Sequence, residues 1–183
     1  AVSASRCVVS RTKPLPLAGV EAVLAGKPVS LTAFHSRKLA DWVRETIARQ
    51  DIAAIVVFSG QMGQYIPADF PGRVVIDLCD VDSAKFASYA AAGERVWLNA
   101  REARLLAVEE EPLGRRADAT ILISKAEAAL YRSRLAAPDK GRPNASAAPD
   151  FAASNADSVS VSAAKGSPVA TARSAIVVAV FTA

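Results

Sequence analysis

Apolar runs alternate along the first two thirds of the chain with segments that repeat apolar side chains at helical spacing. Three of the runs have the length and the β-rich composition of strands, and they occupy residues 53–60, 74–78 and 119–124. Their apolar residues are continuous rather than alternating, which is typical of strands covered on both faces. The pattern therefore predicts an α/β fold, with a parallel sheet and flanking helices.

The segments between these runs predict helices. A capped amphipathic pattern fills residues 36–50, a shorter helix at 17–26 ends at glycine, and another helix follows Ser124. Residues 83–111 form one long helical pattern, which Gly93 either bends or interrupts and which is expected to end at Pro112. A short strand is also predicted at residues 6–10.

The composition changes after residue 136. Residues 137–174 are rich in Ala, Ser, Pro, Asn and Asp, which predicts a low-complexity linker or a disordered segment. Residues 175–183 form a new strand that either pairs with the preceding sheet or opens a second domain. The predicted organisation is a partial Rossmann-like domain over residues 1–136, this linker, and an isolated strand.

Charge and cysteine content narrow the classes of partner and compartment. The net charge is +4, but no dense Lys/Arg run with interleaved aromatics occurs, so we predict no nucleic-acid partner. Cys7 and Cys79 lie far apart without a CxxC motif, which fits a reducing compartment and no zinc site. No secretory signal pattern is present, and we predict a cytoplasmic protein.

Polar side chains follow each of the three predicted strands, where ligands bind in parallel α/β sheets. Asp77, Asp80 and Asp82 lie within six positions at the end of the second strand. Asp82 or Ser83 is well placed to cap the next helix, whereas Asp77 and Asp80 are candidates either for a ligand or metal site or for a structural role.

The other two strand ends carry candidates of a different kind. Gln61, Gln64 and Tyr65 follow the first strand, and their amides and phenol suit a sugar-like, polyhydroxylated ligand or an ordinary surface turn. Ser124 begins a capping box with Glu127, which explains it structurally, although a helix N-terminus can also bind an anion.

Several common sites are excluded or disfavoured. GxGxxG and GxxxxGK[ST] loops are absent, so dinucleotide and P-loop sites lack their phosphate-binding loops. His35 is the single histidine and supports no catalytic triad. The glutamates at 109–111 are interpreted as a solvated helix end.

Five segments in series resemble one known family: GKPVSL, VFSGQMGQYIP, VVIDLCDVDSAKFASYA, REARLLAVEEE and ADATILISKAEAALYRSRL. The family is that of glycosyltransferase family 4-like sugar transferases associated with exosortase-linked exopolysaccharide systems. The resemblance covers roughly residues 10–135. It implies part of the N-terminal, acceptor-side domain of a GT-B enzyme, which has two Rossmann-like domains and needs no bound metal or cofactor.

The resemblance also implies roles for the candidate residues. Asp80 would be the catalytic or substrate-facing aspartate, and the acceptor would contact residues of the three strand ends, namely Gln61, Gln64, Tyr65, Asp82 and Ser124. The acceptor would be a polysaccharide or a lipid-linked sugar, and peripheral association at the inner face of the membrane is compatible with such a substrate. The nucleotide sugar would bind only to a C-terminal donor domain, which this chain lacks, so we expect no transferase activity from the chain alone.

Two other functions compete with this one. The first is a non-catalytic α/β binding or interaction domain. The second is a haloacid-dehalogenase-like phosphotransferase, which DVDS, ATILIS and Lys125 imitate, although the aspartate spacing and the absence of a later acidic pair argue against it.

Overall fold

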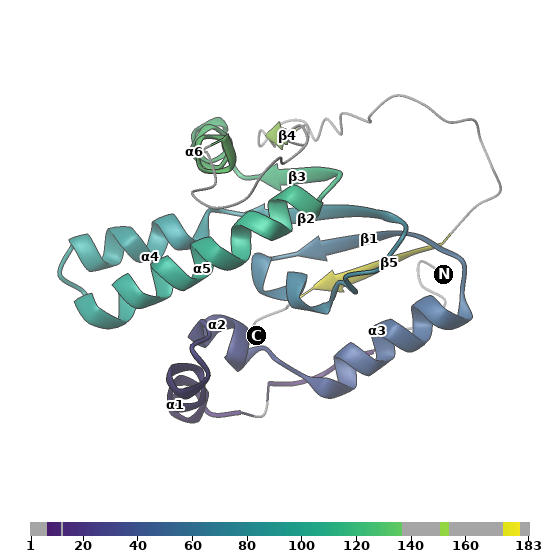
Figure 1. The fold of residues 1–183 in the computed structure, drawn as a ribbon, viewed down its shortest axis with the longest axis horizontal. Coiled ribbons are helices and arrows are strands. Elements are labelled where there is room, and N and C mark those ends of the chain that lie inside the picture. Colours follow the sequence, from purple (N-terminus) through teal and green to yellow (C-terminus); the bar gives the residue numbers. More distant parts are fainter. Residues whose placement is uncertain (1–6, 12, 137–150, 154–173, 180–183) are drawn as a thin grey trace.

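The computed structural model describes residues 7–11, 13–136, 151–153 and 174–179, and its strands form one parallel sheet (Figure 1). The strand order is β4-β3-β2-β1-β5, and all four pairings between neighbouring strands are parallel. The bounds are β1 Ile52–Phe58, β2 Arg73–Cys79, β3 Ala119–Leu122, β4 Phe151–Ala153 and β5 Ser174–Ala179. The predicted α/β class is confirmed, and the fold is consistent with a partial Rossmann-like domain.

Helices flank this sheet (Figure 1). Their bounds are α1 Leu15–Ala25, α2 Val29–Ala33, α3 Arg37–Arg49, α4 Asp82–Ala91, α5 Val96–Arg116 and α6 Lys125–Ala136, with a 3-10 helix η1 at Gly60–Tyr65. Helices α4 and α5 lie side by side as a hairpin, α1 and α2 pack together, and α6 lies beside β3 and β4.

The core lies against one face of the two central strands, where buried residues alternate with half-buried ones. Ile55, Val57, Val74 and Ile76 are all fully or almost fully buried, and they pack in one cluster with Val43 of α3. Burying each side chain of this size contributes about 1.5–3 kcal/mol to stability.

The predicted strand at residues 6–10 is wrong. Residues 7–10 form no strand, and Val8 is 74% exposed. Strand β5 pairs with β1 in parallel. The last strand therefore pairs with the sheet, which was one of its two predicted alternatives.

The predicted helical pattern over residues 83–111 forms two helices, so it is interrupted at Gly93, which was one of the two predicted alternatives. The chain turns between α4 and α5 because Gly93 and Arg95 adopt left-handed backbone angles, with φ of 85° and 37°. Pro112 does not end α5, which continues to Arg116. Leu113, the next residue, packs against the core, so tertiary packing overrides the local preference of proline.

Most of the predicted linker, residues 137–174, lies outside the described residues. The division of the chain into domains therefore stays a prediction.

Candidate functional site

The carboxyl ends of β1 and β2 carry unusual backbone geometry. Ser59 directly follows β1 with φ of 75°, and Cys79 ends β2 with φ of 63°. Left-handed angles cost energy in residues with a Cβ, and such strain gathers at functional sites. The strained residues at these two neighbouring strand ends therefore indicate a candidate functional site at one edge of the sheet.

The strand order selects a position along this edge. From β1 the chain moves to β2, β3 and β4 on one side, whereas β5 lies on the other side of β1. The order reverses beside β1, and open α/β sheets bind ligands at such a switch point, beyond the carboxyl ends of the strands. The segment that leaves β1 there is η1, which also contacts β5.

A cavity of about 220 Å³ lies between η1 and the C-terminal half of α5. Its lining includes polar side chains from three separate elements: Gln61 and Gln64 of η1, Asp82 of α4, and Glu109, Glu110 and Arg116 of α5. The apolar part of the lining includes Leu31, Ile66 and Leu113. Three of the residues predicted from the sequence therefore meet at one cavity.

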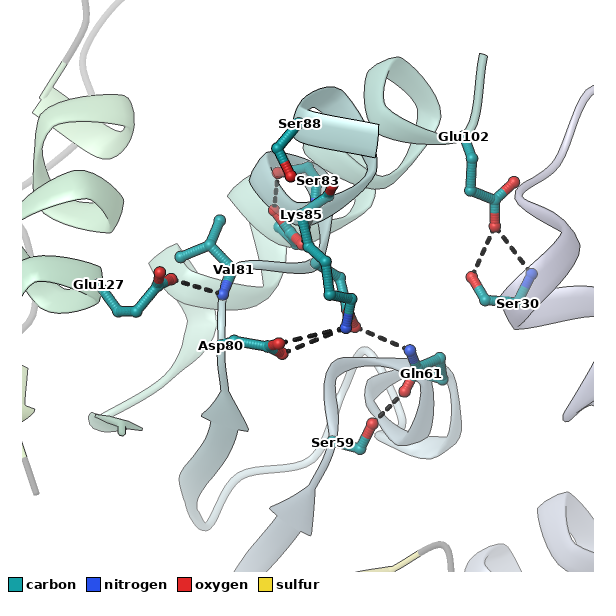
Figure 2. Close-up of polar contacts among 12 residues, drawn as sticks. Ser30, Ser59, Gln61, Asp80, Val81, Ser83, Lys85, Ser88, Glu102 and Glu127 are labelled. Atoms are coloured by element: carbon teal, nitrogen blue, oxygen red, sulfur yellow. Dashed lines mark hydrogen bonds and ion pairs between the residues drawn. The ribbon is translucent and has the colours of Figure 1, made fainter. Parts of the chain in front are cut away.

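Asp82 lines the cavity and is the centre of a polar network, of which Figure 2 shows Gln61, Lys85 and Asp80. The Gln61 Nε2 donates a hydrogen bond of 2.8 Å to Asp82 Oδ2, and Lys85 Nζ donates to Asp82 Oδ1. Lys85 Nζ also contacts Asp80 Oδ2 at 3.2 Å. On its other side, the Gln61 Oε1 accepts a hydrogen bond from the Ser59 hydroxyl, so its amide group is held at both ends.

Lys85 supplies the positive charge that two neighbouring carboxylates need. Burial lowers the pKa of Lys85, but the hydrogen bonds and charges of Asp82 and Asp80 outweigh it, so its pKa lies above the usual value. Lys85 thus remains an ammonium at neutral pH and links the two aspartates. The i,i+3 spacing of Asp82 and Lys85 on a helix was the sequence signal that could have revealed this pair.

The predicted capping of α4 by Asp82 or Ser83 is wrong, because neither side chain accepts a backbone hydrogen bond there. Carboxylates from two other helices do so instead. Glu127 Oε2 accepts from the Val81 N–H at 2.8 Å, and Glu110 Oε1 accepts from the Ser83 N–H at 2.9 Å. The two glutamates thereby satisfy N–H groups at the start of α4 that have no partner within the helix.

Glu110 was predicted to lie at a solvated helix end, which the structure contradicts. The residue is only 7% exposed, and it also accepts a hydrogen bond from the Ser83 hydroxyl. Burial raises the pKa of Glu110, while the hydrogen bonds from Ser83 and the charge of Arg134, 3.9 Å away, partly oppose this.

Tyr65 has a structural position. It is 5% exposed, its hydroxyl donates to the Phe34 carbonyl at 2.5 Å, and it accepts from the Ser36 N–H at 2.7 Å. These bonds fix the turn before α3, and burial raises the pKa of the phenol. Tyr65 is not among the residues that line the cavity.

Gln64 combines a cavity position with a structural one. Its Nε2 donates to the carbonyls of Gln61 at 2.8 Å and Leu31 at 3.2 Å. Its Oε1 lies 3.2 Å from His35 Nδ1, so the single histidine orients this amide. Gln64 therefore connects η1 to α2 and to the turn that follows it.

Ser124 acts as a helix cap, as predicted, since its Oγ accepts from the Glu127 N–H at 3.1 Å. The second half of the predicted capping box is wrong, because the Glu127 carboxylate accepts from Val81 instead. Ser124 is not part of the cavity lining.

Asp77, the unresolved aspartate of the sequence, accepts a hydrogen bond of 3.1 Å from the Cys79 N–H and so supports the strained strand end. Within the described residues, no group of three or more His, Cys, Asp or Glu side chains could hold a metal ion. Burial raises the pKa of Cys79 to about 11, and the neighbouring carboxylates act in the same direction.

Glu102 was missed entirely by sequence reasoning. It is 3% exposed, and it accepts hydrogen bonds from the backbone N–H groups of Val29 at 2.8 Å and Ser30 at 2.9 Å, and from the Ser30 hydroxyl. Figure 2 shows its contacts with Ser30. Glu102 thereby fastens α2 to α5. The partners are more than 70 residues apart in the sequence, so no local pattern could have identified them.

Comparison with known proteins adds nothing to this geometry. No protein-family model matches the chain, and no curated protein or solved structure is significantly similar to it.

Proposed function

We propose that this chain is the acceptor-side part of a sugar transferase of the GT-B type, and that the cavity beside η1 receives a sugar unit of the acceptor. The observation that carries the proposal is the meeting of Gln61, Gln64 and Asp82 at one cavity, at the strand edge beside the switch point. The family resemblance of the five segments supports the same function independently.

The chemistry of the lining suits a polyhydroxylated ligand. A side-chain amide offers both donors and an acceptor, and a carboxylate accepts from hydroxyl groups. The apolar wall formed by Leu31, Ile66 and Leu113 complements the less polar face of a sugar ring. Drug-sized ligands occupy pockets of about 300–1,000 Å³, so a cavity of about 220 Å³ has room for a single sugar unit.

Asp80 is the proposed substrate-facing aspartate. Its side chain is 42% exposed, and Lys85 holds it near Asp82, at the rim of the polar network. In this proposal the nucleotide sugar comes from a separate donor domain. Asp80→Ala in an enzyme containing both domains should lower turnover while leaving stability nearly unchanged.

The proposed compartment is the cytoplasm, with the acceptor at the inner face of the membrane. Cys7 and Cys79 are both free thiols, in agreement with a reducing environment. No helix in the described part of the chain is long and apolar enough to cross a membrane.

Saturation-transfer NMR with a panel of methyl glycosides and disaccharides tests the acceptor site. We expect saturation transfer to the ring protons of at least one sugar. Gln61→Ala should lower the affinity for that sugar by about tenfold, because it removes an amide that forms hydrogen bonds with the ligand. Gln50→Ala is the matched control, because Gln50 is an exposed glutamine at the end of α3. Calorimetric binding of a nucleoside diphosphate without any sugar binding would contradict an acceptor-side function.

A non-catalytic carbohydrate-binding domain is the alternative that one observation favours. Asp80 and Asp82 both pair with Lys85, so both carboxylates already contact an ammonium group of the protein itself. If Asp80→Ala leaves the turnover of the two-domain enzyme unchanged while Gln61→Ala weakens sugar binding, this alternative is preferred.

A further inference from the structure

Three residues with carboxyl side chains line the cavity beside η1, and two of them are engaged by neighbouring side chains of the protein. Asp82 accepts a hydrogen bond from Gln61 through one oxygen and from Lys85 through the other. Glu110 accepts from the Ser83 N–H through one oxygen and from the Ser83 hydroxyl through the other. The oxygens of both residues therefore have partners within the protein.

Glu109 is the third of these residues. It is exposed, and it forms no hydrogen bond or ion pair with any other residue that the structure describes. Leu106, Leu113 and Arg116 line the cavity from the same helix, α5. These three residues and Glu109 follow one another at intervals of three or four positions, so they share one face of the helix. A carboxylate without a partner therefore borders the cavity where it is open to solvent.

Arg116 is the basic residue among the described residues that line the cavity, and it does not neutralise Glu109. Its Nη2 donates a hydrogen bond to the Phe70 carbonyl at 2.6 Å and contacts the Gly72 carbonyl at 3.4 Å. Arg116 lies seven positions after Glu109 on α5, which corresponds to about 10 Å along the helix axis. The negative charge of Glu109 is therefore left for a ligand to meet.

The two glutamines of η1 leave one amide N–H for a ligand. Gln64 Nε2 donates to the carbonyls of Leu31 and Gln61, which engages both of its N–H groups. Gln61 Nε2 donates one N–H to Asp82, so its second N–H remains available. A ligand in the cavity thus meets a neutral donor on Gln61 and an anionic acceptor on Glu109.

We propose that Glu109 selects the charge of the bound sugar, so that the acceptor unit is a neutral or amino sugar rather than a uronic acid. A ring hydroxyl can donate to Glu109 and accept from Gln61, and the ammonium of an amino sugar would form an ion pair with Glu109. The carboxylate of a uronic acid has no proton to donate and would be repelled by Glu109. This charge selection rests on the proposed function, because it concerns the sugar that the acceptor cavity takes.

An NMR titration of the full chain with three methyl glycosides tests the selection. The ligands share one ring configuration and are the neutral hexoside, its 2-amino derivative and the corresponding uronide. At about pH 6 the amino group of the sugar is protonated. We expect the amino sugar to bind about threefold more tightly than the neutral sugar, and the uronide about threefold more weakly, which is the scale of an exposed ion pair. High salt should reduce both differences, because it screens exposed charges.

Glu109→Gln removes the charge and keeps the size of the side chain. It should bring the three dissociation constants to within about twofold of one another, and the neutral sugar should still bind because glutamine also accepts from a hydroxyl. Glu109→Lys should reverse the order of the amino sugar and the uronide. Glu111→Gln is the matched control, because Glu111 lies on the same helix, pairs with Arg115 and is not among the residues that line this cavity. It should keep the order of the unmodified protein.

The titrations separate this charge selection from the proposed function itself. If the neutral sugar binds but the three constants are equal, or if Glu109→Gln leaves their order unchanged, the selection by Glu109 is overturned while the acceptor site is retained. Tightest binding of the uronide would assign the selection to Arg116 and would also overturn it. If none of the glycosides shifts the Gln61 side-chain signal, the acceptor site and the selection are overturned together.

Discussion

Replacing Glu102 by alanine should destabilise the fold strongly, although Glu102 is remote from the candidate site. The substitution removes three hydrogen bonds, to the N–H groups of Val29 and Ser30 and to the Ser30 hydroxyl. Loss of one helix cap costs about 0.5–2 kcal/mol, and a hydrogen bond to a charged group contributes about 1.5–3 kcal/mol. Part of this is offset because alanine no longer buries a carboxylate.

We therefore expect a loss of about 2–4 kcal/mol in the free energy of unfolding. At about 4 °C per kcal/mol for a domain of this size, the melting temperature should fall by about 8–16 °C. Glu102→Gln keeps one acceptor oxygen and should lie between alanine and the native residue. Circular dichroism at 222 nm during thermal and urea unfolding measures both quantities.

Glu109→Ala is the matched control for Glu102→Ala. Glu109 is an exposed glutamate on the same helix, and its removal should change stability by no more than about 0.5 kcal/mol. If Glu102→Ala and Glu109→Ala unfold at the same temperature, Glu102 does not fasten α2 to α5, and the argument from its contacts is refuted.

Three further predictions concern the network around α4. Because burial raises the pKa of Glu110 in the folded protein, its contribution to stability is full when it is protonated and is lost as pH rises from the ordinary value of 4.5 through the folded value. Glu110→Gln should thus gain stability relative to the native protein as pH rises above about 4.5, and a constant difference in melting temperature would contradict this. Cys79, with a pKa of about 11, should react with iodoacetamide at pH 8 about 100-fold more slowly in the native protein than in the denatured protein. Peptide mass spectrometry follows the reaction, and equal rates in the two states would contradict the burial of this thiol. Asp82→Ala should lower the free energy of unfolding by about 1–3 kcal/mol, because it leaves Gln61 and Lys85 without their shared acceptor. Asp80→Ala should lower it by no more than about 1 kcal/mol, and urea unfolding that gives the reverse order of the two variants would contradict the assigned geometry.

The sequence predicted those elements whose signals are local. Strands β1, β2 and β3 were found because each is a short apolar run rich in β-branched residues, although full burial alternates along it. Helix α3 was found because Ser36 caps it and its apolar residues recur at helical spacing. The cavity residues Gln61 and Gln64 were found because they follow a strand end.

The elements that sequence reasoning missed depend on contacts between distant segments. Glu110 belongs to an acidic run that is typical of a solvated surface, and only the packing of α5 against α4 buries it against Ser83. Glu127 has the spacing of a capping box, but the Val81 N–H on a neighbouring element competes for its carboxylate. The spacing of residues along the chain predicts which nearby N–H groups a carboxylate can reach. The tertiary fold can bring an N–H group from a distant segment closer to that carboxylate.

The most direct test of the central claim is an NMR titration of the full chain with the sugar that gives the strongest saturation transfer. The chain has three glutamines, Gln50, Gln61 and Gln64, so their side-chain amide signals can be assigned by single substitutions. The proposed acceptor site predicts that the Gln61 and Gln64 signals shift with one shared dissociation constant while the Gln50 signal stays in place. A titration in which the sugar moves none of these signals, or moves all three equally, would contradict a sugar site at this cavity.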